Sequence, residues 1–78
     1  MITPEIRQFI NTRPWPRNIE YKLTVQDGAI YIVFFRDTWI QLTGEEQLQA
    51  TNVVKDIMFV LRPQGVPIAV AKMESSSG

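Results

Sequence analysis

The sequence predicts an α+β fold: a short N-terminal helix, an antiparallel β-hairpin, a long helix and a C-terminal strand, forming a two-layer sheet with helices packed on it. Three observations predict this fold. Apolar and polar residues alternate without interruption over residues 19–26, which is typical of a half-buried strand. Asp27-Gly28 follows, the residue pair that two-residue hairpin turns prefer. A helix-capping pattern then opens a long apolar-periodic segment at residues 43–61.

The N-terminal helix is expected over residues 4–11. Thr3 can cap the first free amide groups, Pro4 suits the first helical position, and Glu5 favours the positive end of the helix dipole. One apolar stripe follows at helical spacing, made of Ile6, Phe9 and Ile10. The helix must end before residues 13–18, because two prolines force an extended or turning backbone there.

The turn at Asp27-Gly28 sets the register of the hairpin. The second strand, residues 29–35, is rich in β-branched and aromatic residues. The register predicts a core face made of three facing pairs: Val25 with Ile30, Leu23 with Ile32, and Tyr21 with Phe34. Beyond the hairpin, Arg36-Asp37 is read as a second tight turn. A third strand at residues 38–42, completing a meander, remains an open alternative.

The long helix opens with Thr43 and Glu46 as a capping box and ends before Pro63-Gln64-Gly65. At ~100° per residue one broad face is apolar and predicts the core side of the helix. It consists of Ala50, Val53, Val54, Ile57, Met58, Val60 and Leu61. Leu48 and Phe59 point the opposite way.

A last strand is expected over residues 66–73, with Pro67 near its start. The long helix before it is a crossover connection, so this strand should run parallel to an earlier one. We expect a single domain over residues 1–74 and a flexible polar tail at 75–78.

The composition predicts a small folded protein with no strong electrostatic preference. The chain has 78 residues, 45% hydrophobic, and its eight Lys and Arg balance eight Asp and Glu. A domain of this size has a modest expected stability of roughly 4–12 kcal/mol. Cysteine is absent and no apolar run approaches the ~20 residues that span a bilayer. We therefore expect a cytoplasmic location and no membrane contact.

The residue types needed for most catalytic sites are missing. The chain has no His and no Cys, and its three Ser residues stand at 75–77, so triads built on a Ser or Cys nucleophile with a His base cannot form within it. Glu45-Glu46 is the one adjacent carboxylate pair, and neighbouring helical residues do not converge on one atom. We expect no enzyme activity, no metal site and no cofactor.

One candidate binding surface combines aromatic and basic residues. Aromatic rings on a sheet can stack unpaired bases while neighbouring cations bind phosphates, so a nucleic-acid-binding module is the alternative function. The residues are Arg13, Trp15, Arg17, Lys22, Tyr31, Phe35, Arg36 and Trp39. The competing interpretation is that these rings belong to the core.

The order of elements is similar to that of double-stranded-RNA-binding domains, and Arg13-Pro14-Trp15-Pro16 resembles their first loop. The resemblance implies a cluster of lysines at the start of the last helix. That position reads Thr43-Gly44-Glu45-Glu46-Gln47 here. The acidic replacement argues against phosphate binding at that site, so nucleic acid is not the favoured partner.

The second candidate surface would bind protein. Phe59 and Leu48 lie on the helix face away from the core stripe, and the last strand is apolar on both sides, which favours an unpaired edge. The predicted interface residues are Leu48, Phe59, Ile68 and Val70. The favoured function is a protein–protein interaction module, either a homo-oligomer such as a homodimer or an accessory or inhibitory subunit.

Overall fold

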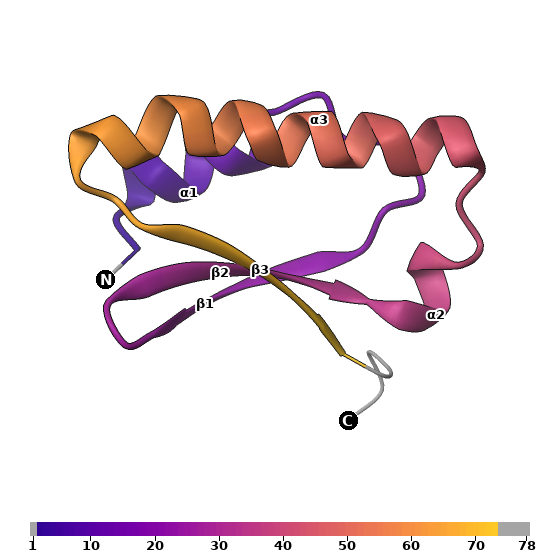
Figure 1. Ribbon diagram of the computed structural model, residues 1–78, viewed down its shortest axis with the longest axis horizontal. Coiled ribbons are helices and arrows are strands. Elements are labelled where there is room, and N and C mark those ends of the chain that lie inside the picture. The colour runs from indigo at the N-terminus through magenta and orange to yellow at the C-terminus, as the bar shows by residue number, and fades with distance from the viewer. Residues whose placement is uncertain (1, 74–78) are drawn as a thin grey trace.

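The computed structural model describes residues 2–73 and has the predicted α+β architecture. Both α1 and α3 lie on the same side of one mixed sheet, whose strand order is β1-β2-β3 (Figure 1). The elements in chain order are α1 (Pro4–Asn11), β1 (Tyr21–Gln26), β2 (Ala29–Phe35), α2 (Arg36–Trp39), α3 (Gly44–Leu61), the 3-10 turn η1 (Arg62–Gln64) and β3 (Ile68–Met73).

The predicted register and turn type of the hairpin are both confirmed. β1 and β2 pair antiparallel with Tyr21 opposite Phe34, Leu23 opposite Ile32 and Val25 opposite Ile30. Asp27 and Gly28 have φ values of 54° and 80°, so both central residues of the turn have the positive φ that a type I′ turn requires.

The predicted ends of the helices are also confirmed. The Thr3 hydroxyl accepts a hydrogen bond from the Ile6 amide at 3.1 Å. At α3, the Thr43 hydroxyl accepts from the Glu46 amide at 3.1 Å, and the Glu46 carboxylate accepts from the Thr43 amide at 2.8 Å. These reciprocal bonds satisfy amides that a helix start leaves without partners.

The core lies between α3, α1 and the inner face of the sheet. Five residues of the predicted α3 stripe are buried: Ala50, Val53, Val54, Ile57 and Leu61. All but Ala50 belong to one cluster with Ile10 from α1, with Ile30, Ile32 and Phe34 from β2, and with Ile68 from β3. One predicted core residue is an exception, since Val25 at the end of β1 is 41% exposed.

Residues 36–42 form neither the tight turn considered at Arg36-Asp37 nor the third strand that the sequence left open. The segment begins instead with the short helix α2, in which the Ile40 amide donates to the Arg36 carbonyl at 3.0 Å. Trp39 packs on Phe34 with ring centroids 5.2 Å apart, and Leu42, three residues on, is buried. The same apolar spacing therefore serves a helical turn.

β3 runs parallel to β2, as the crossover through α3 predicts, with Ile68 opposite Ile30. It begins at Ile68, two residues later than expected, and the Pro67 carbonyl accepts from the Ile30 amide at 2.9 Å. The tail predicted at residues 75–78 lies outside the described residues.

Candidate interaction surface

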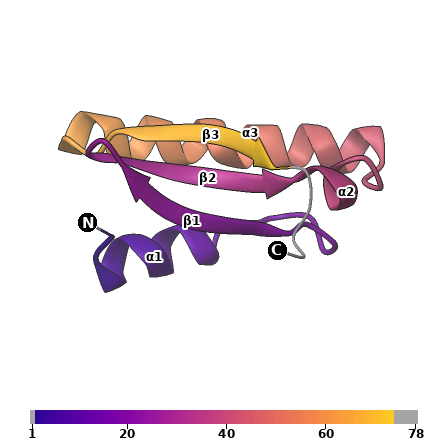
Figure 2. The same ribbon diagram turned by 90° about the horizontal axis from the view of Figure 1, so that it is seen from below.

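β3 forms one margin of the sheet (Figure 2). It pairs with β2 on one side and with no described strand on the other. Such an edge offers backbone N–H and C=O groups to a further strand. β3 therefore meets the backbone requirement for strand addition.

The hydrogen bonds show which residues of β3 face outward. Pro67 accepts a bond from β2, at Ile30, and the backbone groups of successive strand residues alternate in direction, so 69 and 71 also face β2. Residues 68, 70 and 72 then face the free edge. The Arg62 guanidinium donates to the Ile68 carbonyl at 3.0 Å, which agrees with this assignment and caps one end of the edge. We call the outward backbone groups of Ile68, Val70 and Lys72 the β3 edge.

An apolar cavity of about 160 Å³ opens beside the β3 edge. Its lining combines β2, α2, α3 and β3 residues: Phe34, Trp39, Thr51, Val54, Val70 and Lys72. An apolar cavity of about 150 Å³ is large enough to hold benzene, so this one has room for one aliphatic side chain. The Lys72 ammonium lies 5.0 Å from the centre of the Trp39 ring, which places a positive charge at the cavity.

A second depression, of about 420 Å³, lies at the C-terminal end of α3. It is lined by Lys55, Met58, Phe59, Arg62 and Pro63. Phe59 is 80% exposed, a large fraction for an aromatic side chain. Arg62 lines this depression and also caps the β3 edge, so one side chain borders both features.

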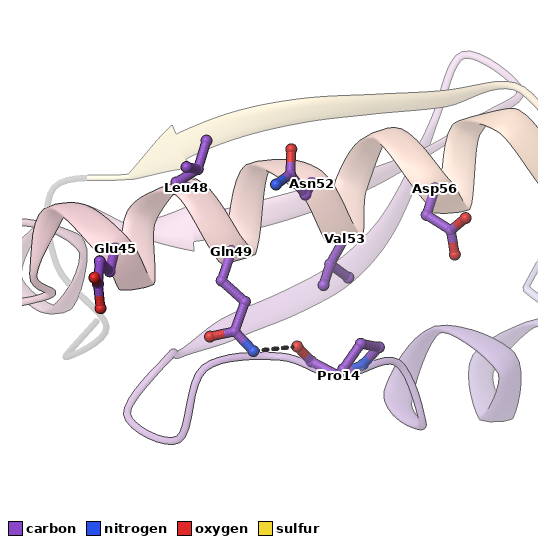
Figure 3. Close-up of a pocket in the computed structure, with 7 residues that line it drawn as sticks. All are labelled: Pro14, Glu45, Leu48, Gln49, Asn52, Val53 and Asp56. Atoms are coloured by element: carbon purple, nitrogen blue, oxygen red, sulfur yellow. Dashed lines mark hydrogen bonds between the residues drawn. The ribbon is translucent and has the colours of Figure 1, made fainter.

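A third depression, of about 410 Å³, runs along the opposite side of α3, between the helix and the proline segment (Figure 3). The Gln49 side-chain amide bridges the two by donating to the Pro14 carbonyl at 2.7 Å. Its lining residues are Pro14, Glu45, Leu48, Gln49, Asn52, Val53 and Asp56. We call it the acidic groove, because its charged residues, Glu45 and Asp56, are both carboxylates.

The predicted interface residues are exposed in three cases out of four. Leu48, Phe59 and Val70 are 61%, 80% and 40% exposed. Ile68 is 2% exposed and belongs to the core; its side chain points toward α3 at the start of β3. Ile68 is therefore removed from the side-chain interface, although its carbonyl faces the edge.

The aromatic and basic constellation is divided between different parts of the molecule. Trp15 packs on Tyr21 at 4.6 Å and edge-on to Phe34 at 6.0 Å, and its indole N–H donates to the Ile10 carbonyl at 2.8 Å. Trp39 packs on the other side of Phe34. Both tryptophans are thus part of the inner, helix-covered side of the sheet, as the competing interpretation proposes.

The other members lie elsewhere. Tyr31, Phe35 and Lys22 occupy strand positions whose side chains point to the outer face of the sheet, opposite to Phe34. The Arg13 guanidinium lies 4.2 Å from the centre of the Phe9 ring and donates to the Phe9 carbonyl at 2.9 Å. Arg17 and Arg36 are exposed. The structure therefore does not assemble these residues into one stacking platform.

Five contributors to the β3 side of the molecule were missed from the sequence: Ile40, Lys55, Arg62, Lys72 and Met73. Ile40 and Met73 are 69% and 41% exposed, and with Arg36, Trp39 and Lys72 they line a further depression of about 410 Å³. Lys55 and Arg62 complete the set around Phe59. The helical spacing of Lys55, Phe59 and Arg62 was a readable signal, since residues three or four apart share a helix face.

Within residues 2–73 there is no group of three or more Asp or Glu close enough to hold a metal ion. Over the same residues, no helix is long and apolar enough to cross a membrane. No protein-family model, no curated protein and no solved structure matches the chain.

The phenol of Tyr21 gives the packed aromatic cluster a measurable pH dependence. Burial raises the pKa of Tyr21 above its ordinary value of 10.0, and the neighbouring Trp15 indole offsets part of this rise. The phenol O–H itself donates to the Asn11 side-chain carbonyl. The folded chain therefore keeps the proton to a higher pH than the unfolded chain does. The stability should fall as the pH rises through about 10 toward the raised pKa.

This prediction is tested by the melting temperatures of the wild type and Tyr21→Phe from about pH 8 to pH 12. Because the two proteins differ only in this phenol, the difference between the two curves isolates Tyr21. The wild type should lose stability relative to Tyr21→Phe above about pH 10. Curves that stay parallel would contradict the assignment, and Tyr31→Phe on the outer face is the control.

Proposed function

We propose that the chain is a small non-enzymatic protein–protein interaction module that docks through the β3 edge and the apolar side chains around it. One observation carries the proposal. The strand edge at Val70 and Lys72 has no described partner, and a cavity large enough for one side chain lies directly beside it. Main-chain pairing supplies affinity in strand addition, and adjacent pockets supply specificity.

The exposed apolar side chains support the same proposal. Phe59 and Ile40 are 80% and 69% exposed and line depressions on the β3 side, whereas Leu48, 61% exposed, lines the acidic groove. A single exposed apolar residue is ordinary, but Phe59 and Ile40 accompany a strand edge. Burying a Phe fully stabilises by roughly 1.5–3 kcal/mol, while association costs several kcal/mol of rigid-body freedom. Phe59 alone is therefore too little, and the proposal needs the β3 edge as a second contact.

The non-enzymatic part of the proposal rests on chemistry. The chain contains neither His nor Cys, and no described polar or charged residue is buried in the core. The carboxylates of the acidic groove, Glu45 and Asp56, lie eleven helical residues apart, about 16 Å along the axis. Two carboxylates at that separation do not act together on one bond.

The proposal is tested by comparing wild type, Phe59→Glu and Val70→Pro in two assays, with Lys22→Glu on the outer sheet face as the control. Sedimentation over a range of concentrations measures self-association, and retention of proteins from the native host on the immobilised chain measures association with others. We expect complexes with wild type and Lys22→Glu that weaken strongly with Phe59→Glu and Val70→Pro.

Either a self-complex or a specific partner with this mutational pattern supports the proposal. A wild type that is monomeric throughout and retains nothing that the variants fail to retain would refute it. Far-UV circular dichroism checks that each variant folds. A Phe59→Glu variant that does not fold would contradict the 80% exposure of Phe59.

A further inference from the structure

The charged residues around α3 are separated by sign. On the β3 side, the depressions next to the edge hold Lys55, Arg62 and Lys72, and no described carboxylate lines them. On the other side, the acidic groove holds Glu45 and Asp56, and no described cation lines it. The net charge of zero thus conceals a basic border along the β3 edge.

The positions of two of these cations relative to β3 are known. Arg62 contacts the carbonyl of Ile68, at one end of the strand. Lys72 lies toward the other end, on the side of the sheet that faces Trp39. Val70 stands between them and borders the apolar cavity. Along the free edge the helix side of the sheet therefore presents a cation, an apolar cavity and a second cation.

A second copy of the chain does not complement this arrangement. If two β3 strands paired antiparallel about Val70, Lys72 of one copy would lie opposite Ile68 of the other, beside its Arg62. Like charges brought together in this way oppose association. The other margin of the sheet, β1, reads Tyr-Lys-Leu-Thr-Val-Gln. Its nearest carboxylates, Glu20 and Asp27, lie just outside the strand and seven positions apart, too far apart to reach both cations of the β3 edge.

We propose that the β3 edge binds an extended segment of a different protein in which an apolar residue is flanked, two positions away on each side, by acidic residues. The proposal rests on the proposed function and names its partner chemistry. Residues two apart in a strand point to the same face. The apolar side chain enters the cavity beside Val70 while the two carboxylates reach Lys72 and Arg62.

Backbone pairing completes the recognition. In an antiparallel addition, the amide and carbonyl of the apolar residue pair with those of Val70. At the start of β3 a partner amide replaces the Arg62 guanidinium on the Ile68 carbonyl, which leaves the guanidinium to bind the incoming carboxylate. Hydrogen bonds between a guanidinium and a carboxylate are stronger than those between neutral groups, so this exchange favours an acidic partner.

The test uses synthetic fluorescent peptides and fluorescence anisotropy at low and physiological salt. The probes share the pattern X-Thr-Val-Thr-X within identical flanks, where X is Glu, Gln or Lys. We expect the Glu peptide to bind at least about tenfold more tightly than the Gln peptide, the Lys peptide not to bind, and salt to weaken the Glu peptide most.

Two backbone-modified versions of the Glu peptide test strand addition separately from charge. A methyl group on the amide nitrogen of the central valine blocks the bond to Val70, whereas the same methyl on a neighbouring threonine points away from β3. Binding should be lost with the first and kept with the second. Equal effects of the two methyl groups would overturn the antiparallel pairing that the proposal assigns.

Two protein variants test the assigned residues. Arg62→Glu/Lys72→Glu should reverse the order of the peptides, whereas Lys22→Glu/Arg17→Glu, with the same charge change away from the β3 edge, should leave it unchanged. Val70→Pro removes an outward N–H and no bond to β2, a substitution that edge strands tolerate. It should abolish binding of every peptide while the chain stays folded.

Peptides that bind regardless of charge, or that do not bind at all, would overturn the inference. The proposed function fails separately, in the sedimentation and retention assays. If those assays show complexes that Val70→Pro abolishes while the Glu peptide does not bind, the β3 edge is a docking site but its partner is not an acidic segment. A β3-edge homodimer in sedimentation would likewise refute the acidic partner and leave the proposed function in place.

Discussion

Replacing Ile57 with alanine should lower the free energy of unfolding by about 2–5 kcal/mol. Ile57 is 0% exposed and belongs to the core cluster that joins α3 to the sheet. The substitution removes buried methyl groups and leaves a cavity that neighbours on a sheet and a helix cannot close. This loss is a substantial fraction of the total stability of roughly 4–12 kcal/mol expected for 78 residues.

Urea denaturation followed by circular dichroism measures this loss, and Phe59→Ala is the matched control. Phe59 lies on the same helix, two residues away, and is 80% exposed. Its truncation should change the stability by no more than about 0.5 kcal/mol, because surface substitutions away from special features have small effects. A loss at Phe59 as large as that at Ile57 would show that Phe59 is buried in solution.

The parts of the fold that the sequence predicts well are those that local chemistry determines. The hairpin register follows from one two-residue turn and strict alternation, and each predicted pair is observed. The threonine caps and the helix-breaking residues place both ends of α1 and α3 within a residue or two. In these segments each local preference agrees with the tertiary packing, so local rules suffice.

Residues 36–42 show where local rules are insufficient. Trp39, Ile40 and Leu42 are compatible with a strand or a helical turn, because a short apolar run has no decisive period. The contact that selects the helix is the packing of Trp39 on Phe34, which a linear pattern does not contain. The same limit applies to Ile68: the apolar character of the last strand was visible, but α3 decides which of its side chains are covered.

The candidate site was predicted in part. The exposure of Leu48 and Phe59 follows from the helical projection, and the free edge was predicted from the apolar residues on both sides of the last strand. The basic border required the structure, because Lys55, Arg62 and Lys72 come from α3, from η1 and from β3. Carboxylates elsewhere in the chain bring the net charge to zero, so the clustering of these three cations can be recognised only in the folded structure.

The turn at Asp27-Gly28 offers a test in which the backbone alone changes. Gly28 has a φ of 80°, and a Cβ added there meets no described atom within 4 Å. No clash therefore contributes to the effect of a larger residue. Gly44, at the start of α3, has equally open space around its Cα but no left-handed φ, so it is a matched control.

Replacing Gly28 with valine should lower the stability by about 1–3 kcal/mol and the melting temperature by roughly 4–8 °C for each kcal/mol. A β-branched residue strongly disfavours positive φ, and the register of β1 and β2 depends on this turn. Calorimetry should show a much smaller change for Gly44→Val, and Gly28→Asn should recover part of the loss, since Asn adopts the left-handed region more readily. Equal melting temperatures for the two valine variants would mean that the type I′ turn is absent in solution.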